Sequence, residues 1–203
     1  MNDGYPRNLP NPDLPNPDLA HSDMAGRNLP GDPTARARVA RMIRVDHAGE
    51  YGAQRIYQGQ LAVLGRGPHG DVLRHMQAQE QHHLDTFAGL IADRRVRPTA
   101  LLPLWHIAGF ALGAITAAMG ERAAMACTVA VEEAIDTHYG AQSAALDDDE
   151  TPLRDTIERF RAEELEHRDI GLANDAERTP GYRLLHRIIT AGCRVAIAIS
   201  ERV

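Results

Sequence analysis

Residues 153–170 read LRDTIERFRAEELEHRDI, a pattern that combines regularly spaced apolar residues with two potential metal ligands. Leu153, Ile157 and Phe160 recur at spacings of three and four, which predicts an amphipathic helix. Glu164 and His167 continue the same apolar stripe, where an ionised carboxylate is costly unless something compensates its charge. Because residues three apart point to the same side of a helix, both groups can face one metal ion.

A second Glu-x-x-His pair, Glu80 and His83, lies on the apolar stripe of an earlier predicted helix. Each pair follows a single stripe glutamate on the preceding long helix: Glu50 comes 30 residues before Glu80, and Glu132 comes 32 residues before Glu164. The chain therefore reads as two similar halves. One Glu from each of two helices, with Glu-x-x-His from two others, is the ligand set of di-iron and di-manganese helical bundles.

Six residues on four helices thus form the predicted metal site: Glu50, Glu80, His83, Glu132, Glu164 and His167. Taken singly, each has a simpler explanation, because a lone Glu is usually at the solvent boundary and a lone Glu-x-x-His is usually a surface pair. Taken together, four carboxylates balance two divalent cations, and neutral imidazoles add donor nitrogens without charge. Mixed carboxylate and imidazole ligands favour non-haem iron or manganese over structural zinc.

Polar residues beside these positions are expected to have lesser roles. Three glutamates fall off the apolar stripes and are expected to be solvated: Glu133, Glu163 and Glu166. His82 fits the ligand spacing less well than His83. Five residues could support the ligands or could serve only as caps and surface groups: Asp46, His47, Asp136, His138 and Tyr139.

Helical periodicity extends over most of the chain, and no segment sustains the period of two that a strand requires. Helices are predicted over 34–64, 71–94, 121–146, from 151 onward, and 181–202. The predicted fold class is all-α, a ferritin-like four-helix bundle with two additional apolar or amphipathic helices, formed by residues 34–203. Residues 1–33 are rich in Pro, Asn, Asp and Gly and are predicted to be a disordered N-terminal tail.

Residues 99–120 contain no Asp, Glu, Lys or Arg and follow the basic segment Arg94–Arg97. A basic flank beside apolar surface favours an interfacial helix on an anionic membrane. The run is long enough to span a bilayer, but Pro103, a histidine and three glycines weaken that interpretation. A buried core helix is the third alternative. The spacing Gly109-x-x-x-Gly113 permits a close helix contact.

Composition argues against several functions. A net charge of −6 gives no basic surface for nucleic acid. Cys127 and Cys193 form no CxxC pair and are expected to be reduced thiols. The segment Gly65–Gly70 matches G-x-G-x-x-G but follows a predicted helix instead of a strand, which argues against dinucleotide binding. The first thirty residues lack an apolar core and carry several Asp, so neither a signal peptide nor a mitochondrial presequence is expected.

On these residues, the chain resembles the demethoxyubiquinone hydroxylase family of ubiquinone biosynthesis. The likeness extends over about residues 40–203 and is carried by RVDHAGEYGA at 44–53, ACTVAVEE at 126–133, EELEHRDIG at 163–171 and AGCRVAI at 191–197. The resemblance implies that the six positions named above are the metal ligands. No further catalytic residue is expected.

The resemblance also implies a monooxygenase that uses two iron ions and O2 to hydroxylate the ring of a demethoxyubiquinol, a polyprenyl quinol, in a late step of ubiquinone biosynthesis. Its implied partners are that quinol, a membrane surface and other ubiquinone-biosynthesis proteins. Its implied place is peripheral, on the cytoplasmic face of a bacterial cytoplasmic membrane. The reductant, the tail length and the oligomeric state stay open.

Two other classes of protein use the same ligands: ferritin-like iron-handling proteins and peroxide-consuming di-metal proteins. An iron-storage cage needs a soluble outer surface, which the uncharged run 99–120 and the apolar last helix oppose. A peroxide-consuming protein would turn over without any effect of a quinol.

Overall fold

The computed structural model describes residues 32–203. This part of the chain contains six α-helices and two short 3-10 helices, and no strand occurs within it. The α-helices are α2 (Ala35–Leu64), α3 (Gly70–Asp93), α4 (Leu102–Ala118), α5 (Glu121–Ala145), α6 (Thr151–Ala173) and α7 (Tyr182–Ser200). The predicted all-α fold class is confirmed. The predicted tail falls, except for residues 32 and 33, outside the described residues.

The predicted helix bounds agree with the structure to within a few residues. Helix α6 begins at Thr151, where the sequence predicts its start. A 3-10 turn, Asp148–Glu150, leads directly into α6, and the Thr151 hydroxyl donates to the carbonyl oxygen of Asp148. Residues 65–69 connect α2 to α3, so the glycine-rich segment joins two helices as expected. Both cysteines are free thiols.

Helix α5 is the central element, and its composition explains its position. Every residue from Ala123 to Val131 is buried, and all are small or apolar. A helix that is apolar on every side must be covered on every side. Accordingly, α5 packs against α4, α6 and α7, and hydrogen bonds join it to α2, including one from the Gln60 amide to the carbonyl oxygen of Ala124.

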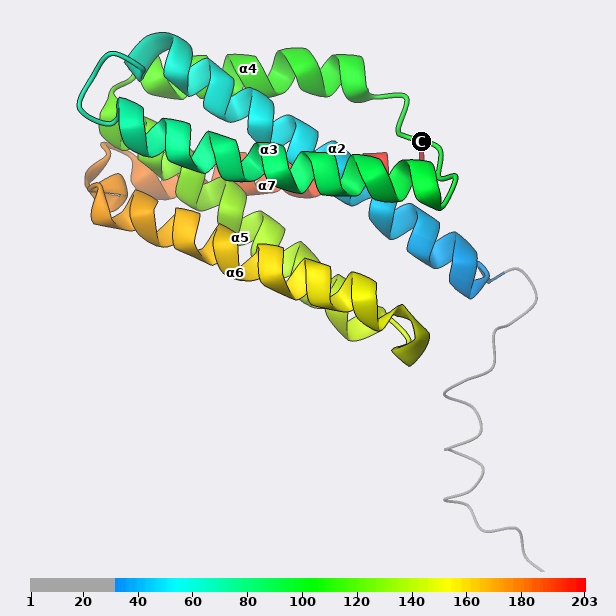
Figure 1. Ribbon diagram of the computed structural model, residues 1–203. Helices are drawn as coiled ribbons and strands as arrows, with labels where there is room; N and C mark the ends of the chain where they lie inside the picture. Colours follow the sequence, from blue (N-terminus) through cyan, green and yellow to red (C-terminus); the bar gives the residue numbers. More distant parts are fainter. Residues whose placement is uncertain (1–31) are drawn as a thin grey trace, which may run out of the picture. The chain divides into compact units, whose positions relative to one another are not determined.

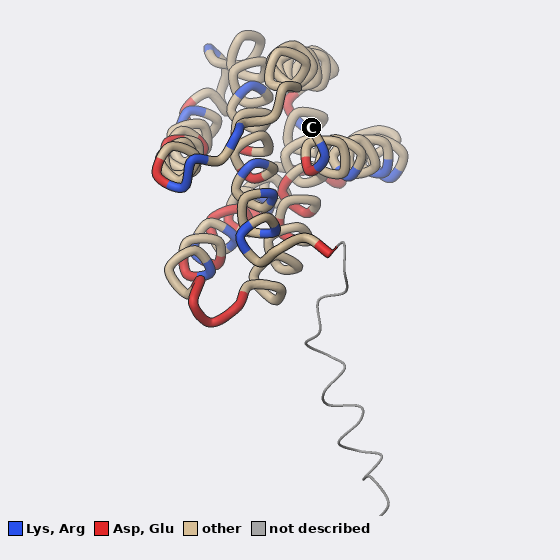
Figure 2. The backbone as a smooth tube through the Cα atoms, turned by 90° about the vertical axis from the view of Figure 1, so that its right-hand side faces the viewer, with Lys and Arg blue, Asp and Glu red and all other residues tan. Residues whose placement is uncertain are grey.

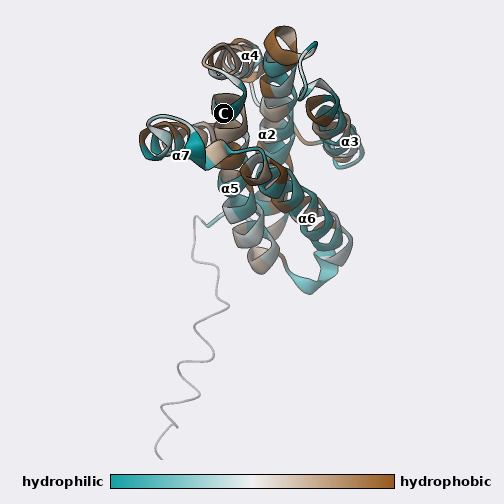
Figure 3. Ribbon diagram, turned by 90° about the vertical axis from the view of Figure 1, so that its left-hand side faces the viewer, coloured by the Kyte–Doolittle hydropathy of each residue, from teal (hydrophilic) through white to brown (hydrophobic). Residues whose placement is uncertain are grey.

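The helices form three layers (Figures 1 and 3). The middle layer holds α2 and α5, with α3 and α6 on one side and α4 and α7 on the other. The middle layer (α2 and α5) and the layer of α3 and α6 carry the predicted metal ligands. The expected arrangement of a four-helix bundle with two additional helices therefore describes this part of the chain.

Two apolar clusters separate the ligand positions from the ends of the bundle. One cluster includes Ile43, Phe87, Tyr139 and Phe160. The other includes Tyr57, Leu73, Met76, Met125 and Val129. On α2, α3 and α5, a predicted ligand lies between a residue of the first cluster and a residue of the second. On α6, Glu164 lies between Phe160 of the first cluster and Ile170, which packs against the second. The predicted ligands are thus placed at mid-bundle, sealed above and below by packed side chains.

Glycines bring α4 against the backbone of α2. A Cβ atom at Gly109 would lie 2.7 Å from the carbonyl oxygen of Gly52, and one at Gly113 would overlap the carbonyl oxygen of Ile56. On α2, a Cβ at Gly59 would overlap the carbonyl oxygen of Phe110. The close contact that the Gly-x-x-x-Gly spacing permits is therefore present, and it fixes α4 on the bundle by backbone approach.

The outer side of α4 is exposed and apolar. Leu104, Ile107 and Ile115 are each more than half exposed, and Ile107 reaches 69%. The buried-core alternative for this run is therefore wrong, because only the glycine side of the helix faces the bundle. No helix in the described part of the chain is long and apolar enough to cross a membrane.

We expect Gly113→Ala to destabilise the fold by about 2 kcal/mol, because the added methyl group must push α4 away from α2. For a domain of this size, the melting temperature should fall by roughly 5 °C in thermal denaturation. Gly89→Ala is the matched control, since a Cβ there meets no atom within 4 Å and should raise stability by roughly 0.5–1 kcal/mol. Equal melting temperatures for the two variants would refute the close crossing.

Candidate metal centre

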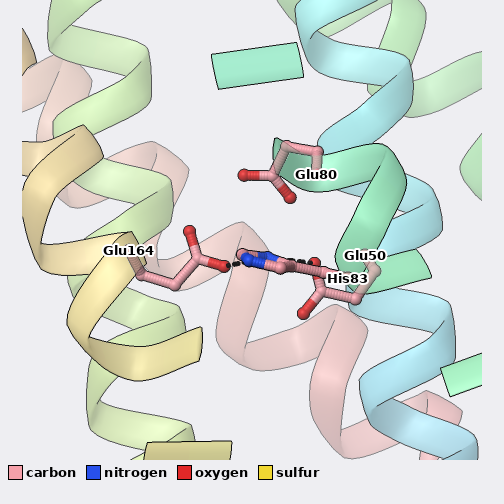
Figure 4. Close-up of side chains that lie close together, drawn as sticks. All are labelled: Glu50, Glu80, His83 and Glu164. Atoms are coloured by element: carbon pink, nitrogen blue, oxygen red, sulfur yellow. Dashed lines mark ion pairs between the residues drawn. The ribbon is translucent and has the colours of Figure 1, made fainter. Parts of the chain in front are cut away.

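The structure brings together all six residues that the sequence predicts as ligands. Glu50 comes from α2, Glu80 and His83 from α3, Glu132 from α5, and Glu164 and His167 from α6. None of the six side chains is more than 1% exposed. Figure 4 shows Glu50, Glu80, His83 and Glu164 pointing toward one another from three helices.

The six residues form two overlapping groups, each able to hold one ion. In each group the potential ligand atoms lie within 4.8 Å of one another. The first group contains Glu50, Glu80, His83 and Glu164, and the second contains Glu80, Glu132, Glu164 and His167. Glu80 and Glu164 belong to both groups, so each could bridge two ions. Each group has one further glutamate and one histidine of its own.

The distances between ligand atoms match those around a metal ion. Glu164 Oε1 lies 3.1 Å from His83 Nδ1, and Glu164 Oε2 lies 3.2 Å from His167 Nδ1. Glu80 Oε1 lies 3.1 Å from His167 Nδ1. Two ligands about 2.1 Å from one metal and at right angles to it are about 3 Å apart. Glu164 therefore directs one oxygen toward each position.

Unsatisfied polar atoms support a metal at this place. Eight buried oxygen and nitrogen atoms of the six residues make no hydrogen bond: Glu50 Oε2, both carboxylate oxygens of Glu80, His83 Nδ1, Glu132 Oε2, both carboxylate oxygens of Glu164, and His167 Nδ1. Buried polar atoms are nearly always paired in folded proteins. Carboxylate oxygens and imidazole nitrogens that converge without partners are the donor set for iron or manganese. The residues present therefore fit two metal ions.

Two buried tyrosines support Glu50 and Glu132, each of which belongs to only one of the two groups. The Tyr57 hydroxyl on α2 donates to Glu132 Oε1 on α5 at 2.7 Å. Reciprocally, the Tyr139 hydroxyl on α5 donates to Glu50 on α2. Burial, and then the charge of the facing glutamate, raise the pKa of each tyrosine well above its usual range. Both hydroxyls therefore stay protonated and remain donors.

The sequence leaves a supporting role open for Tyr139 and assigns none to Tyr57. Each tyrosine follows the glutamate of its own helix by seven residues, which keeps both on the same helix face. The repeat between the two halves was the signal that could have identified Tyr57.

Each histidine has an outer acceptor for its second nitrogen. His83 Nε2 lies 2.7 Å from Glu163 Oε2, and His167 Nε2 lies 3.0 Å from Gln79 Oε1. The prediction that Glu163 is solvated is wrong: its side chain reaches sideways from α6 to the imidazole and is 28% exposed. Gln79 was missed, although it precedes Glu80 as Glu163 precedes Glu164.

The remaining candidates have more distant roles. Asp46 is buried one turn before Glu50, and it contacts His138 Nε2 at 3.2 Å and accepts from Gln142 at 2.7 Å. Burial raises the pKa of Asp46 to about 6. Asp136 accepts from Arg161 instead of supporting a ligand. Glu166 is exposed as expected, and the side chain of Glu133 is partly exposed and contacts His186. His82 is exposed and lies outside the cluster, and His47 makes no hydrogen bond through Nδ1.

The electrostatics of the metal-free cluster favour bound protons. Burial, and then the charge of Glu164, raise the pKa values of Glu80 and Glu132 well above their usual range. Burial also raises the pKa of Glu164. Burial lowers the pKa of His83, but its contacts with Glu164 and Glu50 outweigh this and raise it to about 12. Burial also lowers the pKa of His167, but its contact with Glu80 outweighs this effect, so the pKa of His167 is raised.

We expect the metal-free protein to lose stability as the pH rises from about 5 to 8. The folded cluster keeps protons that the unfolded chain releases above its carboxyl pKa of 4.5 and imidazole pKa of 6.5, so the free energy of unfolding falls with pH. A divalent metal must displace these protons, so its stabilising effect should grow with pH. Melting temperatures with a chelator and with excess Mn(II), at pH 6 and pH 8, measure this; a metal effect that shrinks at pH 8 would contradict it.

Comparison with known proteins identifies the family. A family model described as "Ubiquinone biosynthesis protein COQ7" matches residues 37–200. The chain is 63% identical over 176 residues to a 3-demethoxyubiquinol 3-hydroxylase of Rhodospirillum rubrum, covering 86% of this chain and 83% of that protein. It is 57% identical over 175 residues to the mitochondrial NADPH-dependent 3-demethoxyubiquinone 3-hydroxylase of Homo sapiens, covering 84% and 81%. The chain belongs to the COQ7 family of ubiquinone biosynthesis proteins.

Proposed function

We propose that this protein is a di-iron monooxygenase that hydroxylates the ring of a demethoxyubiquinol with O2, late in ubiquinone biosynthesis. The observation that carries the proposal is the convergence of four buried carboxylates and two imidazoles in two overlapping groups. The names of the relatives, hydroxylases of demethoxyubiquinol or demethoxyubiquinone, support the substrate and the reaction.

The reaction needs O2, two electrons and two protons. One oxygen atom is inserted into a ring C–H bond to give a C–OH group, and the other takes up the two electrons and two protons and leaves as water. A pair of iron ions held by the six residues would supply the activation of O2. A nicotinamide is the electron donor that the name of the human relative specifies, so we take NADPH as the source of the two electrons.

The protein contributes a site that excludes water and holds its ligands in place. The ligand side chains are almost entirely buried, and the two apolar clusters close the bundle on either side of them. Hydrogen bonds from Tyr57 and Tyr139 fix one oxygen of Glu132 and of Glu50. A dry, fixed site of this kind protects reactive species from solvent.

An apolar cavity of about 440 Å³ provides room for the substrate. It lies between the middle layer and the layer of α4 and α7, and its lining includes Ala53, Leu112, Ile135 and Ala196. Ala53 and Ile135 each follow a predicted ligand, Glu50 or Glu132, by three residues. Cavities of this size and polarity hold drug-sized apolar ligands, so this cavity suits the ring and the first part of a polyprenyl tail.

Exposed apolar residues on two helices of one layer support binding to a membrane, where a polyprenyl quinol resides. This apolar face consists of Leu104, Ile107 and Ile115 on α4, and Leu184, Ile188, Val195 and Ile199 on α7. Both helices belong to the same outer layer (Figure 3). The acidic connection between α5 and α6 lies at the opposite side of the bundle from α4 (Figure 2). We therefore propose peripheral attachment through α4 and α7, on the cytoplasmic face of a bacterial membrane.

The charges around this face differ from those that the sequence indicates. Arg94 forms an ion pair with Glu150 at 2.6 Å, so it is engaged within the fold, whereas Arg95 and Arg97 are exposed. Helix α7 adds Arg183, Arg187 and Arg194 and carries no acidic residue. Basic residues beside an apolar helix face favour anionic lipid.

We expect iron-loaded protein to convert a demethoxyubiquinol to a product heavier by one oxygen atom when NADPH and O2 are present. Mass spectrometry with ¹⁸O2 should place one labelled atom in the product. His167→Ala should lose both iron and product formation, because it removes a ligand from one of the two groups. Glu166→Ala is the control, since Glu166 is an exposed neighbour on the same helix.

Two outcomes would contradict this function. One is full iron content with normal hydroxylation in His167→Ala. The other is rapid consumption of peroxide by the wild-type protein with no oxygen transfer to the quinol, which would favour a peroxide-consuming protein instead.

We expect Ile107→Glu combined with Ile188→Glu to reduce sedimentation with phosphatidylglycerol vesicles at least 10-fold, because burying two carboxylates in the interfacial layer is costly. These side chains are 69% and 61% exposed, so folding should be unaffected. Leu172→Glu on α6, in the opposite layer and 37% exposed, should bind vesicles like the wild type. Equal binding by all three proteins would show that α4 and α7 do not attach to the membrane.

A further inference from the structure

The outer acceptors of the two histidines are arranged crosswise. Glu163 directly precedes Glu164 on α6, and its carboxylate contacts His83 on α3 at 2.7 Å. Gln79 directly precedes Glu80 on α3, and its amide oxygen contacts His167 on α6 at 3.0 Å. The two halves of the chain thus place the same contact in equivalent positions, but one acceptor is a carboxylate and the other is a neutral amide.

Both rings turn the same nitrogen toward the centre. Nδ1 of His83 lies 3.1 Å from Glu164, and Nδ1 of His167 lies 3.1 Å from Glu80 and 3.2 Å from Glu164. A metal bound at Nδ1 requires the proton to be on Nε2. Nε2 then donates outward to Glu163 or Gln79, and this hydrogen bond fixes the tautomer and the ring orientation.

The two hydrogen bonds differ in strength. A hydrogen bond to an ionised acceptor is shorter and about twice as strong as one between neutral groups, and the 2.7 Å and 3.0 Å distances differ in the same direction. A stronger acceptor draws the Nε2 proton outward and makes Nδ1 a better electron donor. Phe160 also stacks on the face of His83 with ring centroids 4.0 Å apart, which restrains that ring further.

Apart from these outer acceptors, the two metal positions have equivalent sets of ligands. Both share Glu80 and Glu164, and each has one glutamate of its own that accepts from a buried tyrosine. The side chain of Glu163 is 28% exposed, so its carboxylate keeps contact with water. The acceptor behind each histidine is therefore the chief chemical difference between the two positions.

We propose that Glu163 and Gln79 are positioning residues that make the two metal positions unequal, so that the position beside His83 binds a divalent metal more tightly than the position beside His167. This inference rests on the proposed di-metal centre. The first ion to enter a metal-free chain then occupies the group of Glu50 and His83, and the ion beside His167 is the more easily lost.

The test is a titration of the full-length, metal-free protein with Mn(II), followed by the electron paramagnetic resonance signal of the free ion. The wild type should bind two ions in two resolved steps. Glu163→Gln keeps the shape but removes the charge, so the tighter step should weaken about 10-fold and approach the second. Gln79→Glu should tighten the weaker step by a similar factor. The double variant Glu163→Gln with Gln79→Glu should separate the steps again.

The double variant distinguishes positioning from general damage, because a merely structural role of Glu163 would not be restored by a charge placed behind the other histidine. Combining each background with His83→Ala identifies the position: this change should remove the tighter step in the wild type and the weaker step in the double variant. If Glu163→Gln leaves the tighter step unchanged, this inference is wrong. If that variant still binds two ions, the proposed metal centre is nevertheless supported. Fewer than two Mn(II) ions in the wild type overturns both.

Discussion

Four carboxylates in the interior of a helical bundle are the constraint on which the rest of the structure depends. Glu50, Glu80, Glu132 and Glu164 are excluded from water, and an isolated buried carboxylate is one of the most costly groups that a fold can contain. Without metal, the cluster accommodates them by binding protons, as the raised pKa values of Glu80 and Glu132 indicate. Two divalent cations would remove the same charge and leave the carboxylates ionised. The fold is therefore a compromise between packing and coordination, and the apolar clusters on either side supply the stability that the polar layer lacks.

The pseudo-symmetry of the chain helps to hold these buried carboxylates in place. Helix α2 corresponds to α5, and α3 corresponds to α6, so each supporting contact occurs twice and in crossed form. Tyr57 supports Glu132 while Tyr139 supports Glu50, and the residue before each Glu-x-x-His glutamate supports the histidine of the opposite half. Crossed contacts tie the two halves to each other, so a ligand cannot move without displacing the partner half.

The fold and the convergence of the six predicted ligands could be foreseen because both depend on helical periodicity, which a sequence displays directly. Glu163 was misjudged because periodicity places a backbone position, whereas a long side chain beside a stripe can still reach inward to His83. The repeat between the two halves points to Gln79 and Tyr57, but their partners, His167 and Glu132, depend on which helices face each other, which a stripe does not reveal. The run at 99–120 was ambiguous for the same reason: only the contact of Gly109 and Gly113 with α2 shows which side of α4 is covered.

The middle layer connects the two regions that the proposed reaction needs. Helices α2 and α5 carry Glu50 and Glu132 toward α3 and α6, and they carry Ala53 and Ile135 toward the cavity under α4 and α7. About one turn of helix thus separates a predicted metal ligand from the cavity wall. Small residues on α2 and α4, such as Gly52 and Gly109, line the cavity as well as the helix crossing, so the close approach that fixes α4 also sets the shape of this cavity. Because the outer side of α4 is exposed and apolar, the proposed attachment to a membrane would give a quinol an apolar path from lipid to the cavity.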